Sequence, residues 1–480
     1  MEHTPHSGYI SPFSTRYAGK EMQRLFSDDF KFATWRKLWV ALAIAEKNQG
    51  LAITDEQIAE MTAHLEDINY EAAELKEREC RHDVMSHVYA YGIQCQKAAG
   101  MIHLGATSCY VTDNTDIIIM RGGLQIIRTK LLHLISLLAD FADRYKALPT
   151  LSYTHLQPAQ LTTVGKRAAL WINEFYMDYL EVEHRLSGLA LLGNKGTTGT
   201  QASFMELFGG DGQKVRDMEQ DIALQMGFDR VVPVSGQTYS RKTDYQVLSA
   251  LSGIAQSASK FSYDIRISQS FKELEEPFET SQIGSSAMPY KRNPMRSERV
   301  TSLARYVMID SLNAAITSGT QWFERTLDDS ANRRIAVSEG FLGVDAILNL
   351  LLNIASGIVV YPKGINARIQ NELPFMATEA ILMHAVMKGG DRQALHERLR
   401  IHSQSSAQRV KEEGLPNDLV DRIVSDPLFG ITKEECLQIM DPVRFTGRSA
   451  EQVTEFLYDI IYPLLQAQSV TLADLPELRV

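Results

Sequence analysis

Long stretches of apolar side chains at helical spacing constrain the fold of this chain more than any other feature. In residues 113–141, apolar side chains recur at alternating intervals of three and four, and the run stops before Pro149. A second run with this spacing covers residues 161–189 and opens just after Pro158, where a helix tolerates proline. The spacing therefore predicts two helices of about 30 residues each.

Three further stretches have the same helical spacing, at residues 247–265, 295–317 and 330–354. Long helices with near-heptad apolar seams are typical of a bundle. Alternating apolar and polar residues bounded by turn pairs are scarce, so an α/β fold has little support. We predict an all-α fold built on a long-helix bundle. The seams are long enough to favour a homo-oligomer that associates through helix faces.

The chain has 480 residues, which is more than one hydrophobic core usually supports. Long-helix periodicity starts near Thr112 and gives way to shorter, charged segments near Gly364. We therefore predict a smaller N-terminal helical domain (1–111), a central long-helix bundle (112–364) and a C-terminal helical domain (365–480).

Charge and cysteine content argue against several classes of protein. The net charge of −10 disfavours a nucleic-acid-binding protein, which would carry a basic face. The four cysteines form no CxxC pair, which indicates a reducing compartment, so we expect a cytoplasmic location. The first residues lack the basic and apolar regions of a leader, and no segment approaches the roughly 20 apolar residues of a membrane span. We therefore expect neither nucleic acid nor a membrane as a partner.

Residues 284–299, which read GSSAMPYKRNPMRSER, place several reactive side chains in a loop between two predicted helices. Loops held by rigid helices are where functional residues concentrate. Glycine and proline mark turns of any kind, however, so composition alone is equally compatible with a surface connector.

This segment matches the SSxMPxKxN signature of the fumarase/aspartase superfamily, whose members eliminate fumarate across a C–N or C–O bond. The segments RYAG, RHDVMSH, GATSCYVTDN, THLQPAQ, KGTTGTQASF and WFERTLDDSANRR extend the similarity over most of the chain. The chain resembles the adenylosuccinate lyases of this superfamily, and the animal-type enzymes most. The resemblance implies the superfamily's all-helical fold and a carbon–nitrogen lyase without cofactors. It also implies a homotetramer whose active sites are shared between subunits.

The implied reaction is β-elimination of fumarate from small phosphorylated purine substrates, adenylosuccinate giving AMP and SAICAR giving AICAR. Elimination removes a proton beside a carboxylate and develops an aci-carboxylate, which needs a fixed cation. Lys291 is the candidate cation, assisted by Asn293 and by backbone N–H groups of the loop. The resemblance assigns Ser285 as the base, which requires surroundings that lower its pKa, and Ser286 is the alternative.

The departing purine nitrogen needs a proton from a general acid whose pKa is near the working pH, and histidine suits this role. The resemblance assigns it to His155, with Glu298 as the supporting carboxylate. Without the motif, His155 is read as a polar capping residue before Pro158.

His82 lies between Arg81 and Asp83, and the resemblance places this trio around the substrate phosphate and the catalytic centre. From sequence alone the trio is typical of a solvated charge cluster. The spacing of His82 and His87 does not match HExxH, and no cysteine cluster accompanies them, so we predict no metal.

A phosphorylated substrate needs several donors, preferably arginines, whose guanidinium forks match phosphate and carboxylate oxygens. Some of these arginines would otherwise be read as surface ion-pair partners. By resemblance, the substrate-binding residues are Arg16, Tyr17, Arg81, Asp83, Thr107, Ser108, Thr154, Gln237, Asn293, Arg299, Arg325, Ser330 and Arg334.

Residues 193–200, GNKGTTGT, do not match the GxxxxGK[ST] pattern and follow a predicted helix rather than a strand, so a P-loop is excluded. Lys195 in this segment is at most a secondary candidate. The competing functions are another fumarate-releasing lyase, such as argininosuccinate lyase, and a catalytically silent, crystallin-like structural protein. The presence of the proposed catalytic set weighs against the silent protein: Ser285, Lys291, His155 and Glu298.

Overall fold

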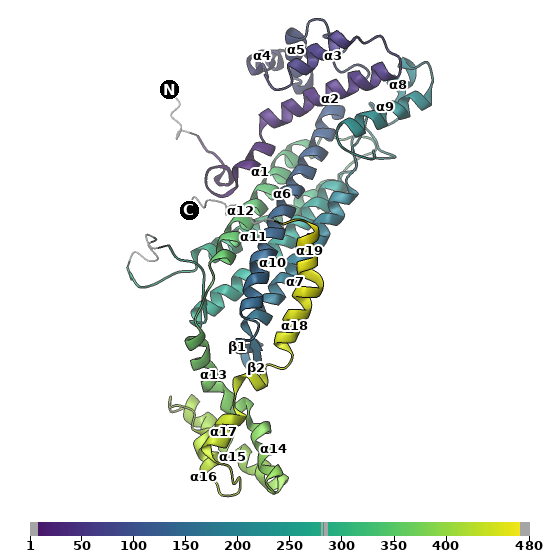
Figure 1. Cartoon of the computed structure of the whole chain (residues 1–480). Helices are drawn as coiled ribbons and strands as arrows, with labels where there is room; N and C mark the ends of the chain where they lie inside the picture. Colours follow the sequence, from purple (N-terminus) through teal and green to yellow (C-terminus); the bar gives the residue numbers. More distant parts are fainter. Residues whose placement is uncertain (1–7, 280–281, 283–286, 471–480) are drawn as a thin grey trace.

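Five long helices form the body of the molecule and run side by side along its length (Figure 1). The computed structural model describes residues 8–279, 282 and 287–470. The prediction of an all-α fold is confirmed. The five helices are α6 (Ser108–Arg144), α7 (Val164–Gly188), α10 (Lys242–Ser270), α11 (Met295–Gly319) and α12 (Asp329–Ser356).

The predicted apolar seams form the core of this bundle. On α6, Met120, Leu124, Ile127 and Leu131 are fully buried, as the alternating spacing of three and four predicts. Helix α6 packs on α7 and α12, and α10 packs on α11, α12 and α7. The predicted helices at residues 295–317 and 330–354 are confirmed as α11 and α12.

The predicted helical start after Pro158 is wrong, because residues before Val164 form a β-hairpin. Strand β1 (Pro149–Thr154) pairs antiparallel with β2 (Gln157–Thr163). Leu161 is buried by pairing with Leu151, not on a helix face. The spacing from Leu161 to Val164 matched a helical period only because a strand ends and a helix begins between them.

Shorter helices lie at the two ends of the bundle (Figure 1). Beyond one end, α2 packs against α3 and α9, and α4 packs against α5. The elements at this end and leading to it are η1 (Phe13–Tyr17), α1 (Lys20–Leu25), α2 (Asp28–Asn48), α3 (Asp55–Ala63), α4 (Tyr70–Cys80), α5 (Asp83–Gln94), α8 (Ala202–Leu207) and α9 (Gly212–Gln225).

At the other end, the chain leaves the bundle through α13 and later returns along it. The returning elements pack on α6 and α7. The predicted domain boundaries at 112 and 364 stay a prediction. The elements are β3 (Leu274–Glu275), β4 (Val359–Val360), α13 (Pro362–Met376), α14 (Thr378–Met387), α15 (Arg392–Lys411), α16 (Leu419–Ser425), α17 (Lys433–Ile439), η2 (Pro442–Phe445), α18 (Ser449–Phe456), η3 (Leu457–Ile461) and α19 (Tyr462–Ala467).

One helix in the described part of the chain, α12, is long and apolar enough to cross a membrane by length and composition. From the sequence we expected no segment of this length and apolar composition. However, 78% of the residues in its most apolar stretch are buried inside the protein. Helices α6, α10 and α11 pack against it, so its apolar surface is covered as in the core helix of a bundle.

Glu46 on α2 is a buried carboxyl group. Neither of its oxygens has a hydrogen-bond partner among the residues that the structure describes. Burial raises the pKa of Glu46 from its ordinary value of 4.5 to about 8. The folded state therefore favours the protonated form, and stability is lost as pH rises from the ordinary pKa through the folded one.

Replacing Glu46 by glutamine is expected to remove this pH dependence. The variant should gain stability relative to the parent between pH 5 and pH 8.5, by on the order of a few kcal/mol. Thermal unfolding of both proteins at several pH values and equal concentration measures the difference. The exposed Glu413 provides the control, because Glu413→Gln changes a side chain that is not buried and should not reproduce the gain in stability. A Glu46→Gln difference that is constant across this range would contradict the argument.

Candidate active site

His82 is held at the start of α5, and both of its ring nitrogens have partners. The backbone N–H of Met85 donates to His82 Nδ1 at 3.3 Å, which makes His82 the N-cap of the helix. Ser108 Oγ lies 3.3 Å from His82 Nε2. Because Nδ1 accepts a hydrogen bond, the neutral ring carries its proton on Nε2 and donates it to Ser108. The structure therefore brings together His82 and Ser108, which the sequence analysis assigned to one site.

The neighbours of His82 also gather here. Arg334 Nη2 on α12 lies 3.3 Å from Asp83 Oδ2. Arg81 ends α4 in the left-handed conformation, with φ of +56°, and its side chain is exposed. A left-handed arginine costs roughly 1 to 2 kcal/mol, and strain of this kind gathers at functional sites. The trio at residues 81–83 is thus an ordered cluster with an ion pair to α12, not only a solvated charge run.

The loop that carries Gln237 packs closely beside this cluster. Cys109, the second residue of α6, donates its thiol hydrogen to Gln237 Oε1 at 3.5 Å, and burial raises the pKa of Cys109 to about 12. A Cβ atom on Gly199 would lie 2.0 Å from the carbonyl oxygen of Ser235, and one on Gly236 would lie 2.5 Å from that of Glu324. Only glycine allows these backbones to approach so closely.

Arg325 lies in the segment before α12. Its Nη1 donates to both carboxylate oxygens of Asp329, at 2.8 and 3.0 Å, while the side chain remains 23% exposed. Ser330 follows in the first turn of α12, and Thr107 precedes α6 without a side-chain capping bond. These residues of the predicted substrate-binding set therefore lie near the ends of α6 and α12 that also carry Ser108 and Arg334.

Arg16 and Tyr17 occupy the short π-helix η1, which packs on α12. The guanidinium of Arg299, on α11, lies 5.9 Å from the centre of the Tyr17 ring. The structure thus brings together Tyr17 of the RYAG segment and Arg299 of the signature segment. Arg16 is exposed.

The signature loop precedes α11. Ser285 and its alternative, Ser286, lie outside the described residues. Lys291 is exposed, and its backbone N–H donates to the carbonyl of Met288 at 2.9 Å, while Asn293 lies two residues further along. Glu298 Oε1 lies 3.8 Å from Arg266 Nη2. Its predicted pairing with His155 stays a prediction.

His155 occupies the tip of the β1–β2 hairpin, so its reading as a capping residue is wrong. Thr154 pairs with Gln157, which leaves His155 and Leu156 as a two-residue turn. Both have positive φ, 52° and 57°, as a type I′ turn requires. Asparagine and glycine are the usual residues there, so a histidine–leucine turn is strained and exposes both side chains. This strain is an independent indication that His155 has a function.

Helix α5, which His82 caps, and the β1–β2 hairpin, which carries His155, lie toward opposite ends of the bundle (Figure 1). His82 contacts Ser108, the first residue of α6, and the hairpin follows the last residue of the same helix. A helix of 37 residues spans about 55 Å. Tyr153, beside the hairpin tip, contacts Phe271 at the far end of α10, which keeps the tip at that end. One chain therefore does not bring His82 and His155 onto one small substrate.

The glycine-rich segment does not present a lysine to a ligand. Lys195 is buried, and its Nζ lies 2.8 Å from both carboxylate oxygens of Glu219. Lys195 therefore has a structural role, and it is no longer a candidate active-site residue. Within the described part of the chain, no three His, Cys, Asp or Glu side chains gather as possible metal ligands.

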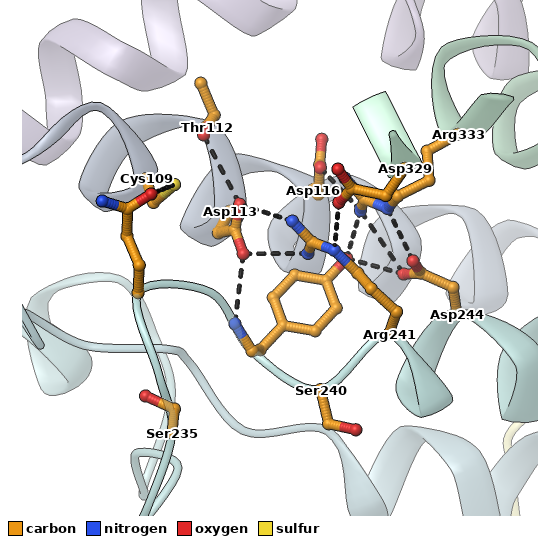
Figure 2. A network of polar contacts seen from close by, with 12 residues as sticks. Cys109, Thr112, Asp113, Asp116, Ser235, Ser240, Arg241, Asp244, Asp329 and Arg333 are labelled. Carbon is orange, nitrogen blue, oxygen red and sulfur yellow. Dashed lines mark hydrogen bonds and ion pairs between the residues drawn. The ribbon is translucent and has the colours of Figure 1, made fainter. Parts of the chain in front are cut away.

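A network of buried polar side chains, which was not predicted from the sequence, joins α6, α10 and α12 (Figure 2). Arg241 and Arg333 each contact two aspartates, and all of these residues are on or next to α6, α10 and α12. The sequence did contain a signal that these residues are buried. Ala336 and Val337 follow Arg333 at helical spacing, and Asp329 lies inside the motif WFERTLDDSANRR.

Two family profiles match the chain. Residues 21–309 match the family described as Lyase, and residues 374–456 match the one described as Adenylosuccinate lyase C-terminus. The adenylosuccinate lyase of Saccharomyces cerevisiae is 52% identical over 464 residues, covering 96% of each chain.

The chain belongs to the adenylosuccinate lyase family.

Other adenylosuccinate lyases are also similar. The Schizosaccharomyces pombe protein is 49% identical, covering 94% of each chain, and the Schistosoma mansoni protein is 47% identical, covering 97% of each. The predicted resemblance is thereby confirmed.

Solved structures share the fold. The 3-carboxy-cis,cis-muconate lactonizing enzyme of Pseudomonas putida has a TM-score of 0.80 at 21% identity, covering 95% of this chain and 99% of that one. A fumarate lyase of Mesorhizobium sp. BNC1 has a TM-score of 0.78 at 22% identity, covering 94% and 99%. At this identity the likeness concerns the fold alone.

Proposed function

We propose that this protein is an adenylosuccinate lyase, which breaks the C–N bond of adenylosuccinate to give AMP and fumarate and cleaves SAICAR to AICAR and fumarate. The observation that carries this proposal is the near full-length match to adenylosuccinate lyases at 47–52% identity. The ordered cluster of His82, Ser108, Asp83 and Arg334 supports it, because these residues form a polar site at the ends of core helices.

The chemistry proceeds by general acid–base catalysis. Ser285, as alkoxide, takes the proton from the succinyl carbon beside a carboxylate, and the electron pair moves onto that carboxylate as the aci-form. Lys291 and Asn293 stabilise the added negative charge. The electron pair then returns to form the double bond of fumarate and breaks the C–N bond, while His155 donates a proton to the departing nitrogen. No metal and no cofactor takes part in this proposed sequence.

The phosphate and carboxylates of the substrate need cationic donors, which lie in two groups of the described residues. Arg325, Ser330 and Arg334 lie before and on the start of α12, and Arg16, Tyr17 and Arg299 lie where η1 meets α11 and α12. Arginine forks bind phosphate oxygens in pairs, so these groups suit a phosphorylated substrate better than an uncharged one.

The active unit is a homotetramer whose sites are shared between subunits. The distance along α6 between His82 and the His155 hairpin supports this, since a second chain has to supply the missing end. Apolar side chains on the outside of the bundle also support association. They are Ile309, Leu312 and Ile316 on α11 and Trp322, Phe323 and Leu327 in the following loop. We place the enzyme in the cytoplasm, with neither nucleic acid nor membrane as a partner.

The purified oligomer is expected to release one fumarate for each AMP formed from adenylosuccinate. Chromatographic measurement of both products tests this, with argininosuccinate as the control substrate. Argininosuccinate carries no phosphate, so it should not be cleaved. Fumarate release from argininosuccinate alone would replace the proposal with the related lyase, and release from neither substrate would favour a silent structural protein.

A further inference from the structure

Arg241 lies at the centre of a network of polar contacts that joins α6, α10 and α12 (Figure 2). Its side chain is 2% exposed. Nη1 and Nη2 donate to Asp113 on α6 at 2.9 and 3.2 Å, and Nε donates to Asp329 on α12 at 2.6 Å. One planar guanidinium thus satisfies carboxylates from two core helices, which is a geometry that suits arginine and not lysine.

Each of these two carboxylates also holds a segment of the candidate site. Asp113 accepts the backbone N–H of Tyr239 at 3.1 Å, two residues after Gln237 in the same loop. Asp329 accepts Arg325 through both of its oxygens. Burial acts against the charge on Asp329, but Arg241 and Arg325 hold its pKa below the ordinary value, so it stays an anion.

We propose that Arg241 is a positioning residue for substrate recognition, which holds Arg325 and the Gln237 loop in place through Asp329 and Asp113 without touching the substrate. This inference rests on the proposed function, because Arg325 and Gln237 are substrate-binding residues only if that function holds.

Replacing Arg241 by lysine is expected to change the balance of charge around Asp329. With Arg241 in place, Asp329 is shared between two guanidiniums, and the Arg325 side chain remains partly exposed. A lysine at position 241 carries its charge on a single ammonium group and lacks the planar fork that donates twice to Asp113 and once to Asp329. The uncompensated buried carboxylate then attracts Arg325 more strongly, and Arg325 becomes less available to substrate.

Arg333 provides a matched control within the same network. It contacts Asp244 at 2.6 Å and Asp116 at 2.8 Å, and its side chain is 12% exposed. Tyr239, through its hydroxyl, is its third partner. Within the described residues, neither Asp116 nor Asp244 contacts a residue assigned to the substrate. Arg333→Lys therefore perturbs a comparable buried ion group without acting on Arg325.

The test compares Arg241→Lys, Arg333→Lys and the parent oligomer in steady-state assays with adenylosuccinate. We expect Arg241→Lys to raise KM about tenfold or more, with a smaller change in kcat, because Arg325 contributes binding energy through charged hydrogen bonds. Arg333→Lys should change KM much less, because its contact with the Tyr239 hydroxyl reaches the Gln237 loop but not Arg325. A purely structural role would instead lower the amount of active oligomer, and hence kcat, at constant KM in both variants.

The double variant Arg241→Lys with Arg325→Lys decides whether Arg241 acts through Arg325. If it does, the rise in KM in the double variant is smaller than the product of the two single rises, because the effects of coupled residues do not add. The inference would be overturned if the rise in KM in the double variant equalled the product of the two single rises. An unchanged KM in Arg241→Lys would also overturn it.

If Arg241→Lys does not assemble, Asp329→Asn takes its place, since it neutralises the carboxylate that both Arg241 and Arg325 bind. Arg325 then loses the anion that orients it, and KM should rise through this loss of positioning. An unchanged KM in that variant would equally overturn the inference. A parent protein that releases no fumarate would remove the proposed function itself, whereas an active parent with an unchanged KM in the variants would remove only the role of Arg241.

Discussion

Replacing His155 by asparagine is expected to lower kcat for fumarate release about 10²- to 10⁴-fold, which is the usual contribution of a general acid. Asparagine is chosen because it adopts positive φ readily, and His155 has a φ of 52° in a two-residue turn. The variant therefore keeps the hairpin and removes only the ionisable ring. Steady-state kinetics together with circular dichroism and thermal unfolding measure the two effects separately.

The neighbouring turn residue supplies the control. Leu156→Gly places glycine at the second position of the same turn, where φ is 57°, and should leave kcat near that of the parent. If His155→Asn kept full activity while folded, His155 would not be the general acid. If Leu156→Gly lost as much activity as His155→Asn, the turn conformation and not the imidazole would be responsible.

Mixing two inactive variants is expected to restore activity if the sites are shared. His82→Ala removes a residue at one end of α6, and His155→Asn removes one at the other end. In a mixed oligomer, some sites receive an intact His82 from one subunit and an intact His155 from another. Because loss of the general acid lowers activity by about 10²- to 10⁴-fold, such sites raise the rate at least about tenfold above that of His155→Asn alone.

The exchange experiment needs two comparisons. Subunits are mixed under conditions that dissociate and reassemble the oligomer, and each variant is treated alone in parallel. A mixture of His155→Asn with His155→Ala should stay inactive, because no subunit supplies the ring. A mixture of His155→Asn with Ser285→Ala extends the test to the proposed base. No recovery in any mixture, despite verified exchange, would show that each site is formed by one chain.

The extent to which the fold could be predicted follows from the range of the interactions involved. Helices α11 and α12 were predicted to within a few residues, because their apolar spacing is a local property that a seam 25 to 28 residues long repeats many times. The hairpin at residues 149–163 was missed. Its strands are short, and its buried positions were few enough to resemble the start of a helix.

In the candidate site, too, local motifs were predicted from the sequence and long-range contacts were not. The signature loop, the trio at residues 81–83 and the His155 segment were recognisable as motifs. The sequence could not show that Lys195 is bound by Glu219 or that Arg241 joins Asp113 to Asp329, because those partners lie 24 to 128 residues apart. Pairing of charged groups at such separations depends on helix packing, which leaves no periodic trace in the sequence.

The sequence by itself determined that the chain forms a bundle of long helices and which side-chain types are available for elimination chemistry, since both depend on residue identity and local spacing. Only the tertiary structure decided where those side chains lie. The packing of α6, α10 and α12 buries the Arg241 network, and strand pairing holds His155 in a strained turn. The length of α6 places His82 and His155 at opposite ends, because a continuous helix is rigid over that distance.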